Sequence, residues 1–356
     1  MRCSDRSHLR LIQYSALDYP RQYWNHSLID LHELCHRFVG SCTRKANSAD
    51  AFAIEFYQFF LSFSILGGIS ASCLYNPALS VVGHWFQKRR ALATGIACTS
   101  GGVGGVWMPL VILYLAPRIG FGWSMRSVAL ICAVHCLCAC ALLRKRLPPP
   151  AKPSAAVDFK ALKELNYTIM TLGLVLVEFA IFIPITYICL YAIYWGWEFQ
   201  DALLLNVWLN LGAVPGRFLP GYVADRLGAV NTMTVISFFC TVLVLCLWIP
   251  ARGSHAVTIA FTVLYGFWSG ASVALAPVCI GLVCRTKDYG KRNGTAYTLC
   301  SFGTLIGIPI AGALLKADNG SYRAMAIFAG LLYVLSFIAY LIGRVLLGGT
   351  RLLKAC

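Results

Sequence analysis

Side chains able to bind an organic acid gather between residues 206 and 228, in a chain that otherwise avoids charge. Charged residues make up only 12% of the 356 residues, yet Arg217, Asp225 and Arg226 lie close together in GRFLPGYVADRLGAVN. A guanidinium is planar and can donate two parallel hydrogen bonds to a carboxylate. Arg217 is therefore a candidate ligand for a small organic anion. The alternative is a structural arginine, paired with Glu178 or with backbone carbonyls.

Two asparagines extend this candidate binding site. The spacing of Asn206, Asn210 and Arg217 places all three near one face of a helix. We expect a polar stripe along that helix, with Arg217 as its charged member.

Glu178 is a candidate proton carrier. It lies about halfway along the apolar run LGLVLVEFAIFIPITYICLY. An ionised carboxylate is costly in such a setting, so protonation is favoured there. A neutral Glu178 bonded to a neighbouring helix explains the residue equally well. Pro184 interrupts the same helix and Tyr187 offers a hydroxyl, which suits the wall of a substrate cavity.

A zinc-protease pattern occurs in the first part of the chain, where residues 32–36 read HELCH. Two histidines one helical turn apart can bind Zn²⁺, with Glu33 as general base. The match is short, and we identify no third ligand. We therefore treat it as a coincidence and expect no metal and no cofactor. A membrane zinc protease would be the alternative.

The elements that position these residues must be membrane-spanning helices. Hydrophobic residues make up 58% of the chain and the mean hydropathy is +0.68. Spanning a bilayer takes about 20 mostly apolar residues in a helix, because every backbone group must be bonded internally. About nine stretches meet this requirement: 52–82, 91–115, 123–143, 167–191, 203–223, 230–249, 257–283, 295–315 and 325–347. We predict an all-α polytopic membrane protein.

The net charge of +16 reflects orientation in a membrane and does not indicate nucleic-acid binding. Basic residues concentrate in alternate loops, which marks those loops as cytoplasmic. The cytoplasmic set includes residues 88–90, 144–163, 226, 285–292 and the tail, whereas the opposite set holds only Arg118, Arg126, Arg252, Lys316 and Arg323. We expect a cytoplasmic C-terminus, and a basic, Pro-rich linker at 144–165 that lies along the membrane surface near anionic lipid.

This topology places Arg217 near the middle of the bilayer. At about 1.5 Å per residue, Arg217 lies roughly 12 Å along its helix from Asp225, the predicted cytoplasmic end. Half of a hydrocarbon core is about 15 Å. An arginine at that depth costs about 2.5–3.5 kcal/mol, which is tolerable if the side chain faces an aqueous cleft.

Two parts of the chain resemble each other at an offset of about 200 residues, as expected for a repeat. Gly67, Pro77, Arg90, Ser100 and Pro109 correspond to Gly266, Pro277, Arg292, Ser301 and Pro309. Two parallel halves of six spans are typical of one class of secondary transporter. Residues 1–50 hold no apolar run long enough to cross, so we expect the first three spans of a twelve-span plan to be absent. The predicted regions are a polar leader at 1–50, the rest of the first half at 51–143, the linker at 144–165, a complete six-helix half at 166–347 and a tail at 348–356.

Several motifs resemble the fungal monocarboxylate-transporter-like branch of the major facilitator superfamily. They are YNPALSVVGHWFQKRRALATGIACTSGGVGGVWMP, GFGWSMR, NLGAVPGRFLPGYVADRLGAVN and YGFWSGASVALAP, beginning at residues 75, 120, 210 and 265. The resemblance covers about 300 residues from Phe52 onward. It implies secondary transport by alternating access, with no enzymatic activity. The implied cargo is a monocarboxylate or related small organic anion moved with protons.

The resemblance also assigns roles to particular residues. It implies substrate binding for Arg217, and a loop motif for Gly221, Asp225, Arg226 and Gly228 that holds helix ends together in one access state; a solvated loop is the alternative. Arg89 and Arg90 fall in the matching stretch of the first half, although a role in orientation is favoured for them. Ala213 stands where animal members carry an aspartate, and the family's first-helix lysine cannot be placed.

Paired glycines complete the candidate residues. Gly101 and Gly105, and at the repeat-related position Gly303 and Gly307, have the four-residue spacing that lets helices pack closely and slide. We interpret them as gating interfaces, with static packing as the alternative.

Two further functions stay open beside anion transport. One is efflux of a fungal secondary metabolite, and the other is a truncated membrane protein that does not transport. In either transport reading the partners are the solute, possibly coupled protons and the lipid bilayer, and we expect residence in the plasma membrane.

Overall fold

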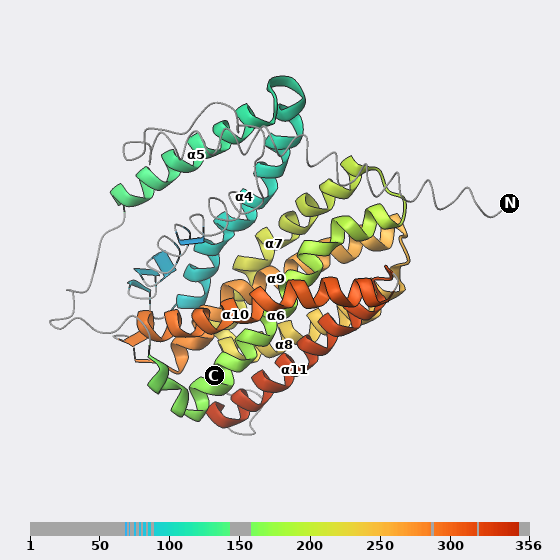
Figure 1. Cartoon of the computed structure of the whole chain (residues 1–356). Coiled ribbons are helices and arrows are strands. Elements are labelled where there is room, and N and C mark those ends of the chain that lie inside the picture. The colour runs from blue at the N-terminus through green and yellow to red at the C-terminus, as the bar shows by residue number, and fades with distance from the viewer. Residues whose placement is uncertain are drawn as a thin grey trace, which may run out of the picture. The chain divides into compact units, whose positions relative to one another are not determined.

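A computed structural model describes residues 89–142, 158–285, 288–318 and 320–348, together with single positions between 68 and 86. The leader at 1–50, with its HELCH pattern, and the tail at 349–356 lie outside the described residues. The long described elements are all helices (Figure 1): α4 (Arg90–Ile119), α5 (Phe121–Leu142), α6 (Leu165–Tyr194), α7 (Phe199–Leu227), α8 (Ala229–Val242), α9 (His255–Leu282), α10 (Tyr289–Ala317) and α11 (Arg323–Gly348).

The chain divides into two compact units. One comprises residues 1–74 and 110–144, and it contains α5 and the last part of α4. The other comprises residues 75–109 and 145–356, and it contains the first part of α4 together with α6 to α11. All the contacts discussed below lie within the second unit.

The helix bounds follow the apolar runs in the sequence. The predicted spans from 91–115 to 325–347 fall on helical segments. Most of these helices run a few residues past the apolar run at one or both ends, because the chain can stay helical in the interfacial region. The prediction of an all-α membrane fold is confirmed. Within the described residues, seven helices are long and apolar enough to cross a bilayer. The predicted count of about nine stays a prediction, since the span at 52–82 falls mostly outside those residues.

The span predicted at 230–249 is not a uniform α-helix. After α8, residues Leu243–Trp248 form a π-helical segment and Ile249–Ala251 a short 3₁₀ turn. Pro250 lacks a backbone N–H and ends the regular pattern. Arg252 and Gly253 then adopt positive φ angles of 43° and 77°, which turns the chain into α9.

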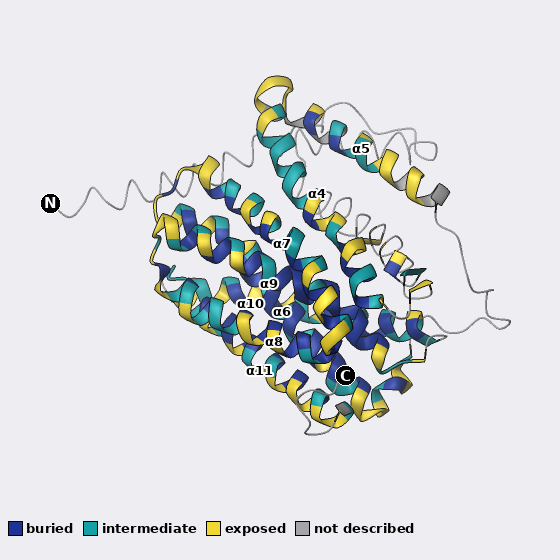
Figure 2. Ribbon diagram, turned by 180° about the vertical axis from the view of Figure 1, so that it is seen from behind, coloured by how far each residue is buried: buried dark blue, intermediate teal, exposed yellow. Residues whose placement is uncertain are grey.

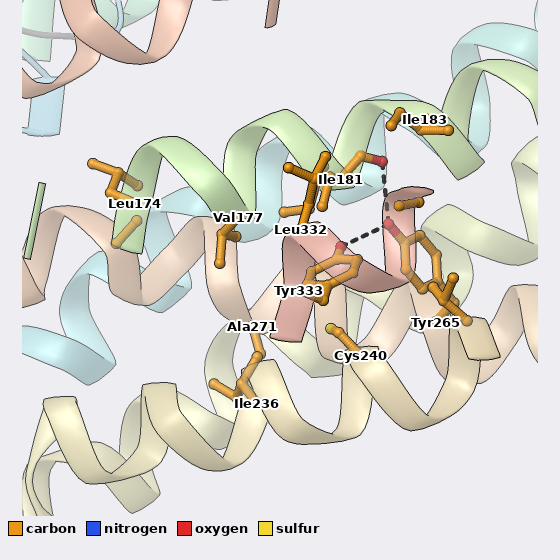
Figure 3. Close-up of a cluster of buried hydrophobic side chains, with 14 of the residues drawn as sticks. Leu174, Val177, Ile181, Ile183, Ile236, Cys240, Tyr265, Ala271, Leu332 and Tyr333 are labelled. Carbon is orange, nitrogen blue, oxygen red and sulfur yellow. Dashed lines mark hydrogen bonds between the residues drawn. The ribbon is translucent and has the colours of Figure 1, made fainter. Parts of the chain in front are cut away.

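The interior of the second unit is built where α7 packs along α9 and α11 packs along α6. Gly216 on α7 meets the backbone of Phe267 on α9, and Gly266 on α9 meets the backbone of Leu209 on α7. Such glycines allow close helix packing in membranes. Farther along, the hydroxyls of Tyr265 and Tyr333 bond at 2.8 Å, and Tyr265 donates to the Ile181 carbonyl at 3.1 Å (Figure 3).

Exposed residues, drawn in yellow, recur along the helices of the second unit (Figure 2). Many of them are large and apolar. Leu172, Leu305 and Leu331 are more than half exposed. A protein in water rarely displays so much contiguous apolar surface, whereas a bilayer solvates it. The pattern of burial therefore agrees with the membrane assignment made from the sequence.

Candidate functional site

Arg217 projects from the middle of α7 toward α4. Its Nη1 donates to the backbone carbonyl of Cys98 at 2.7 Å. Its Nε is buried and has no hydrogen-bond acceptor among the described residues. Arg217 and Glu178 form no ion pair in the described part of the chain. A structural Arg217 was expected to pair either with Glu178 or with backbone carbonyls. Among the described residues, the structure contains the contact with a backbone carbonyl and no ion pair with Glu178.

Gly101 and Gly105 make room for the polar stripe of α7. A Cβ on Gly101 would lie 2.6 Å from Nη1 of Arg217, and a Cβ on Gly105 would overlap the side-chain amide of Asn210. Real Cβ atoms do not approach other atoms so closely, so any side chain here would displace a polar group of α7. These glycines, predicted to pack helices, thus lie directly against two of the predicted binding residues.

The two asparagines lie on this stripe, and one points along α7 while the other points toward α6. The Asn210 Nδ2 donates to the Asn206 carbonyl at 2.8 Å, and the Asn206 Nδ2 donates to the Cys189 Sγ of α6 at 3.2 Å. Both side chains are half-buried. No hydrogen bond to either amide oxygen occurs among the described residues.

Glu178 lies on α6 with only 7% of its surface exposed. No hydrogen bond or ion pair of its carboxyl group occurs among the described residues. It lies one turn before Ile181, whose carbonyl accepts the Tyr265 hydroxyl (Figure 3).

Tyr187 faces α10. Its hydroxyl donates to the Ile308 carbonyl at 3.1 Å and lies against Gly312. Pro184, one turn earlier in α6, is buried inside the helix. Tyr187 thus joins α6 to α10, and the structure does not bring it to Arg217 through any hydrogen bond it describes.

Gly303 and Gly307 of α10 pack against α6. A Cβ on Gly303 would lie 3.3 Å from Val175, and one on Gly307 would overlap the ring of Phe179. The two repeat-related glycine pairs therefore differ in what they contact, because the first pair meets polar side chains and the second meets apolar ones.

Asp225 ties the end of α7 to the start of α4. Its Oδ1 accepts the Ala91 N–H and its Oδ2 accepts the Leu92 N–H, both at 3.0 Å. The first amides of a helix have no partner within the helix, and they favour a negative charge. At Gly221 the two helices come close, because a Cβ there would lie 2.7 Å from the Ala91 carbonyl oxygen.

The other members of the loop motif act locally. Arg226 lies over the ring of Tyr222, 4.4 Å from its centroid, and is exposed. Gly228 has a φ of 96°, which allows the sharp turn between α7 and α8.

Arg89 and Arg90 behave differently from each other. Arg89 is exposed just before α4 begins, which fits the predicted orientation role. Arg90 lies over the ring of Tyr289 on α10, 4.0 Å from its centroid. Its repeat-related counterpart Arg292 forms an ion pair with Glu164, with an Nη1 to Oε2 distance of 2.7 Å.

Comparison with known proteins decides the family. The sequence profile of the Major Facilitator Superfamily matches residues 48–257 and 210–349. The chain belongs to the Major Facilitator Superfamily. Its superfamily relatives are transporters and not enzymes, as the sequence predicted.

Fungal members of the superfamily align over most of this chain. "MFS-type transporter 1" of Ophiocordyceps sp. is 37% identical over 84% of this chain and 67% of its own length. The riboflavin transporter of Saccharomyces cerevisiae is 32% identical over 83% of this chain and 61% of its own. The agnestins efflux protein of Paecilomyces divaricatus is 30% identical over 85% of this chain and 69% of its own. The chain thus spans about two thirds of the length of these relatives.

The superfamily fold is also found among solved structures. The fucose:proton symporter of E. coli superimposes with a TM-score of 0.66 over 90% of this chain and 82% of its own, at 14% identity. At that identity the likeness concerns the fold.

Sequence reasoning missed some residues of this superfamily member that lie beside the predicted ones. Tyr75 and Tyr297 pack edge to face with ring centroids 6.0 Å apart, and the Tyr297 hydroxyl is buried with no hydrogen-bond partner among the described residues. Tyr289 and Glu164, which meet Arg90 and Arg292, were also missed. The sequence repeat relates Arg90 to Arg292, and each lies in the first turn of a helix. This correspondence could have indicated that both arginines have partners at the helix ends.

Proposed function

We propose that this chain carries a small organic anion across a membrane by alternating access, with Arg217 as the residue that binds the acid group. The observation that carries the proposal is the half-satisfied guanidinium: one nitrogen donates to the Cys98 carbonyl while Nε has no acceptor in the described residues. A buried donor without a partner costs free energy, so a solute carboxylate that accepts from it is favoured. The glycines that face Arg217 and Asn210 leave this side of α4 free of side chains.

Asp225 supplies the contact that would break and form again during transport. Two charge-assisted hydrogen bonds hold the end of α7 to the start of α4. Bonds of this kind contribute about 1.5–3 kcal/mol each, which is enough to bias a two-state equilibrium of a few kcal/mol. In our proposal this contact is made in one access state and is lost in the other.

Glu178 is the proposed site of proton coupling. It is buried and has no cationic partner among the described residues, so we propose that it carries a proton in one access state and releases it where the other access state exposes it to water. If Glu178 instead stays neutral throughout, transport of the anion is not linked to protons at this residue.

A monocarboxylate or related organic acid is the proposed cargo, and efflux of a secondary metabolite is the second candidate. The first rests on the arginine and on the motifs shared with monocarboxylate transporters. The second is favoured by the agnestins efflux protein among the relatives and by Ala213, which replaces the aspartate of animal members. The basic loops favour a cytoplasmic C-terminus, and we propose the plasma membrane as the location.

Uptake of labelled monocarboxylates into vesicles, with and without a pH gradient, tests these proposals. We expect the wild-type chain to accumulate label, Arg217→Ala to lose it, and Arg217→Lys to lose most of it because an ammonium cannot reproduce the planar pair of donors. Glu178→Gln should keep binding and lose dependence on the gradient. Full uptake by a correctly inserted Arg217→Lys variant would remove the proposed role of the guanidinium.

A further inference from the structure

A cavity of about 730 Å³ lies at the end of the second unit opposite to Asp225. It is formed by the end of α6, the segment that joins α8 to α9, and the start of α11. We call it the vestibule and define it by Tyr194, Trp195, Trp248, Arg252, Tyr322 and Arg323. Its volume is in the range of sites for small organic molecules, about 300–1,000 Å³. It lies roughly 20 Å along α6 from Glu178, so it is separate from the site proposed above.

Aromatic rings line this cavity and pack on one another. Tyr194 lies 5.7 Å from Trp195 and 5.5 Å from Tyr322, measured between ring centroids. Tyr and Trp are common at membrane surfaces, where they face the lipid headgroups. Here Tyr194 and Trp195 border a concavity, and they are 55% and 46% exposed. They therefore offer stacking surfaces to a planar molecule.

The two arginines of the vestibule lie at opposite kinds of helix end. Arg323 is the first residue of α11, near the positive end of the helix dipole, whereas Arg252 caps the end of the helical run Ala229–Ala251, where a cation is favourable. Neither forms an ion pair with any carboxylate in the described ranges. The nearby Asp318 instead accepts the Ala324 N–H at 3.4 Å. An anion would be attracted by both side chains and by the start of α11.

The loop that presents Arg252 is held in one conformation. Its backbone φ of 43° is unusual for a residue other than glycine, and costs about 1–2 kcal/mol. Two neighbouring aromatic residues fix the next peptide unit: the Gly253 N–H donates to the Tyr191 hydroxyl at 3.0 Å, and Trp197 Nε1 donates to the Gly253 carbonyl at 3.1 Å. Backbone strain that the surroundings maintain in this way is typical of binding sites.

One hydrogen-bond donor completes the lining. The Tyr322 hydroxyl is half-buried and protonated at physiological pH, since burial raises the pKa of this side chain from 10 to about 12. An oxygen atom of a ligand would accept a hydrogen bond from this hydroxyl.

We propose that the vestibule binds an aromatic organic anion, with its acid group at Arg252 and Arg323 and its rings against Tyr194, Trp195 and Tyr322. A soluble aromatic acid and an anionic lipid headgroup share the charge that these arginines recognise. The rings favour the soluble acid, because a lipid offers them only a flexible chain. This site goes beyond the proposed transport through Arg217, and either can fail without the other.

Equilibrium dialysis of the purified full chain in a non-ionic detergent tests the proposal. The probe is tritiated naphthoate, and naphthalenemethanol serves as the uncharged analogue. All variants are made in an Arg217→Gln background, so that the transport site does not contribute to the signal. We expect naphthoate to bind, and the double variant Arg252→Gln with Arg323→Gln to weaken binding about a hundredfold, which is roughly tenfold for each of the two charge-assisted contacts that are lost. Lys316→Gln is the control. It removes a charge from the last turn of α10, which is outside the cavity, and it should leave naphthoate binding unchanged.

Other outcomes would overturn the proposal. Equal binding of naphthoate and naphthalenemethanol, or unchanged naphthoate binding after loss of both arginines, would mean that the cavity selects no anion. Lysophosphatidylglycerol is tested in parallel. If it binds and naphthoate does not, the vestibule is a lipid site. Arg323→Gln alone is the second variant, because Arg323 is exposed and its change leaves the strained Arg252 loop intact; it should weaken naphthoate binding roughly tenfold.

Discussion

The carboxylate of Asp225 and the amide of Ala91 meet at 3.0 Å, and they join the end of α7 to the beginning of α4 across more than a hundred residues of sequence. The second carboxylate oxygen takes the next amide in the same way. One side chain thus acts as an external cap for a helix to which it does not belong.

Asp225→Asn should weaken this contact. The amide nitrogen of asparagine cannot accept, so one of the two hydrogen bonds is lost and the charge that favours the helix end disappears. We expect the free energy of unfolding to fall by about 0.5–2 kcal/mol, as for the loss of other helix caps, and transport to be slower. Differential scanning fluorimetry and vesicle uptake measure the two effects. Arg226→Gln, which removes only an exposed stacking contact, is the control; equal effects of both changes would contradict the capping role.

Much of the fold could be predicted from the sequence, and the partners of the functional residues could not. The bilayer requires apolar runs of nearly constant length, so the helices from α4 to α11 were found by hydropathy. The π-helical segment before Ile249 was missed, since its residues are as apolar as those of a regular helix. Arg217 and Asp225 were recognised by their charge, but both bind main-chain atoms, and those contacts depend on how closely glycines let two helices approach.

Gly105→Ala tests the close approach of α4 and α7, and Gly104→Ala is its control. The added methyl group would overlap the Asn210 amide, whereas a Cβ on Gly104 meets no atom within 4 Å. We expect Gly105→Ala to cost about 1–3 kcal/mol, as for other overpacked sites, and to reduce uptake. Gly104→Ala should be neutral or slightly stabilising because alanine favours helix. Equal thermal midpoints for both variants would show that α4 and α7 are farther apart than described.

Glu164 gives the stability a pH dependence. Its hydrogen bond to the Arg292 guanidinium lowers the pKa of this carboxyl below the usual value of 4.5. The stabilisation is therefore fully present above about pH 4.5, and it is lost as the pH falls through the lowered pKa in the folded state. The size should not exceed about 1 kcal/mol, because Glu164 is 54% exposed and solvent screens the pair.

Thermal midpoints measured from pH 7 down to pH 3 check this expectation. The thermal midpoint of Glu164→Gln should be lower than that of wild type at neutral pH, and the two midpoints should become equal in acid. Glu198→Gln changes an exposed carboxylate that forms no ion pair with any described residue, and it should run parallel to wild type. A constant gap between Glu164→Gln and wild type would mean that the ion pair makes no contribution.

Removal of the two buried tyrosine hydroxyls should have unequal effects. Tyr265→Phe removes both the bond to the Ile181 carbonyl and the bond to Tyr333. Tyr333→Phe removes only the second bond. At about 1 kcal/mol for each bond, Tyr265→Phe should lower the free energy of unfolding by about twice as much as Tyr333→Phe. Thermal unfolding of the two variants decides the order, with Tyr114→Phe as an exposed control.

The carbonyl that holds Arg217 belongs to the main chain, so this contact does not depend on which side chain residue 98 carries. Cys98 itself packs with Leu79 and Ala274 in a small apolar cluster. A variant in which every native cysteine is replaced, with alanine at position 98, would keep the main-chain carbonyl that accepts from Arg217. A single cysteine introduced elsewhere into this variant could then carry a spectroscopic label. The same independence would let other side chains replace cysteine at position 98 without loss of the contact with Arg217.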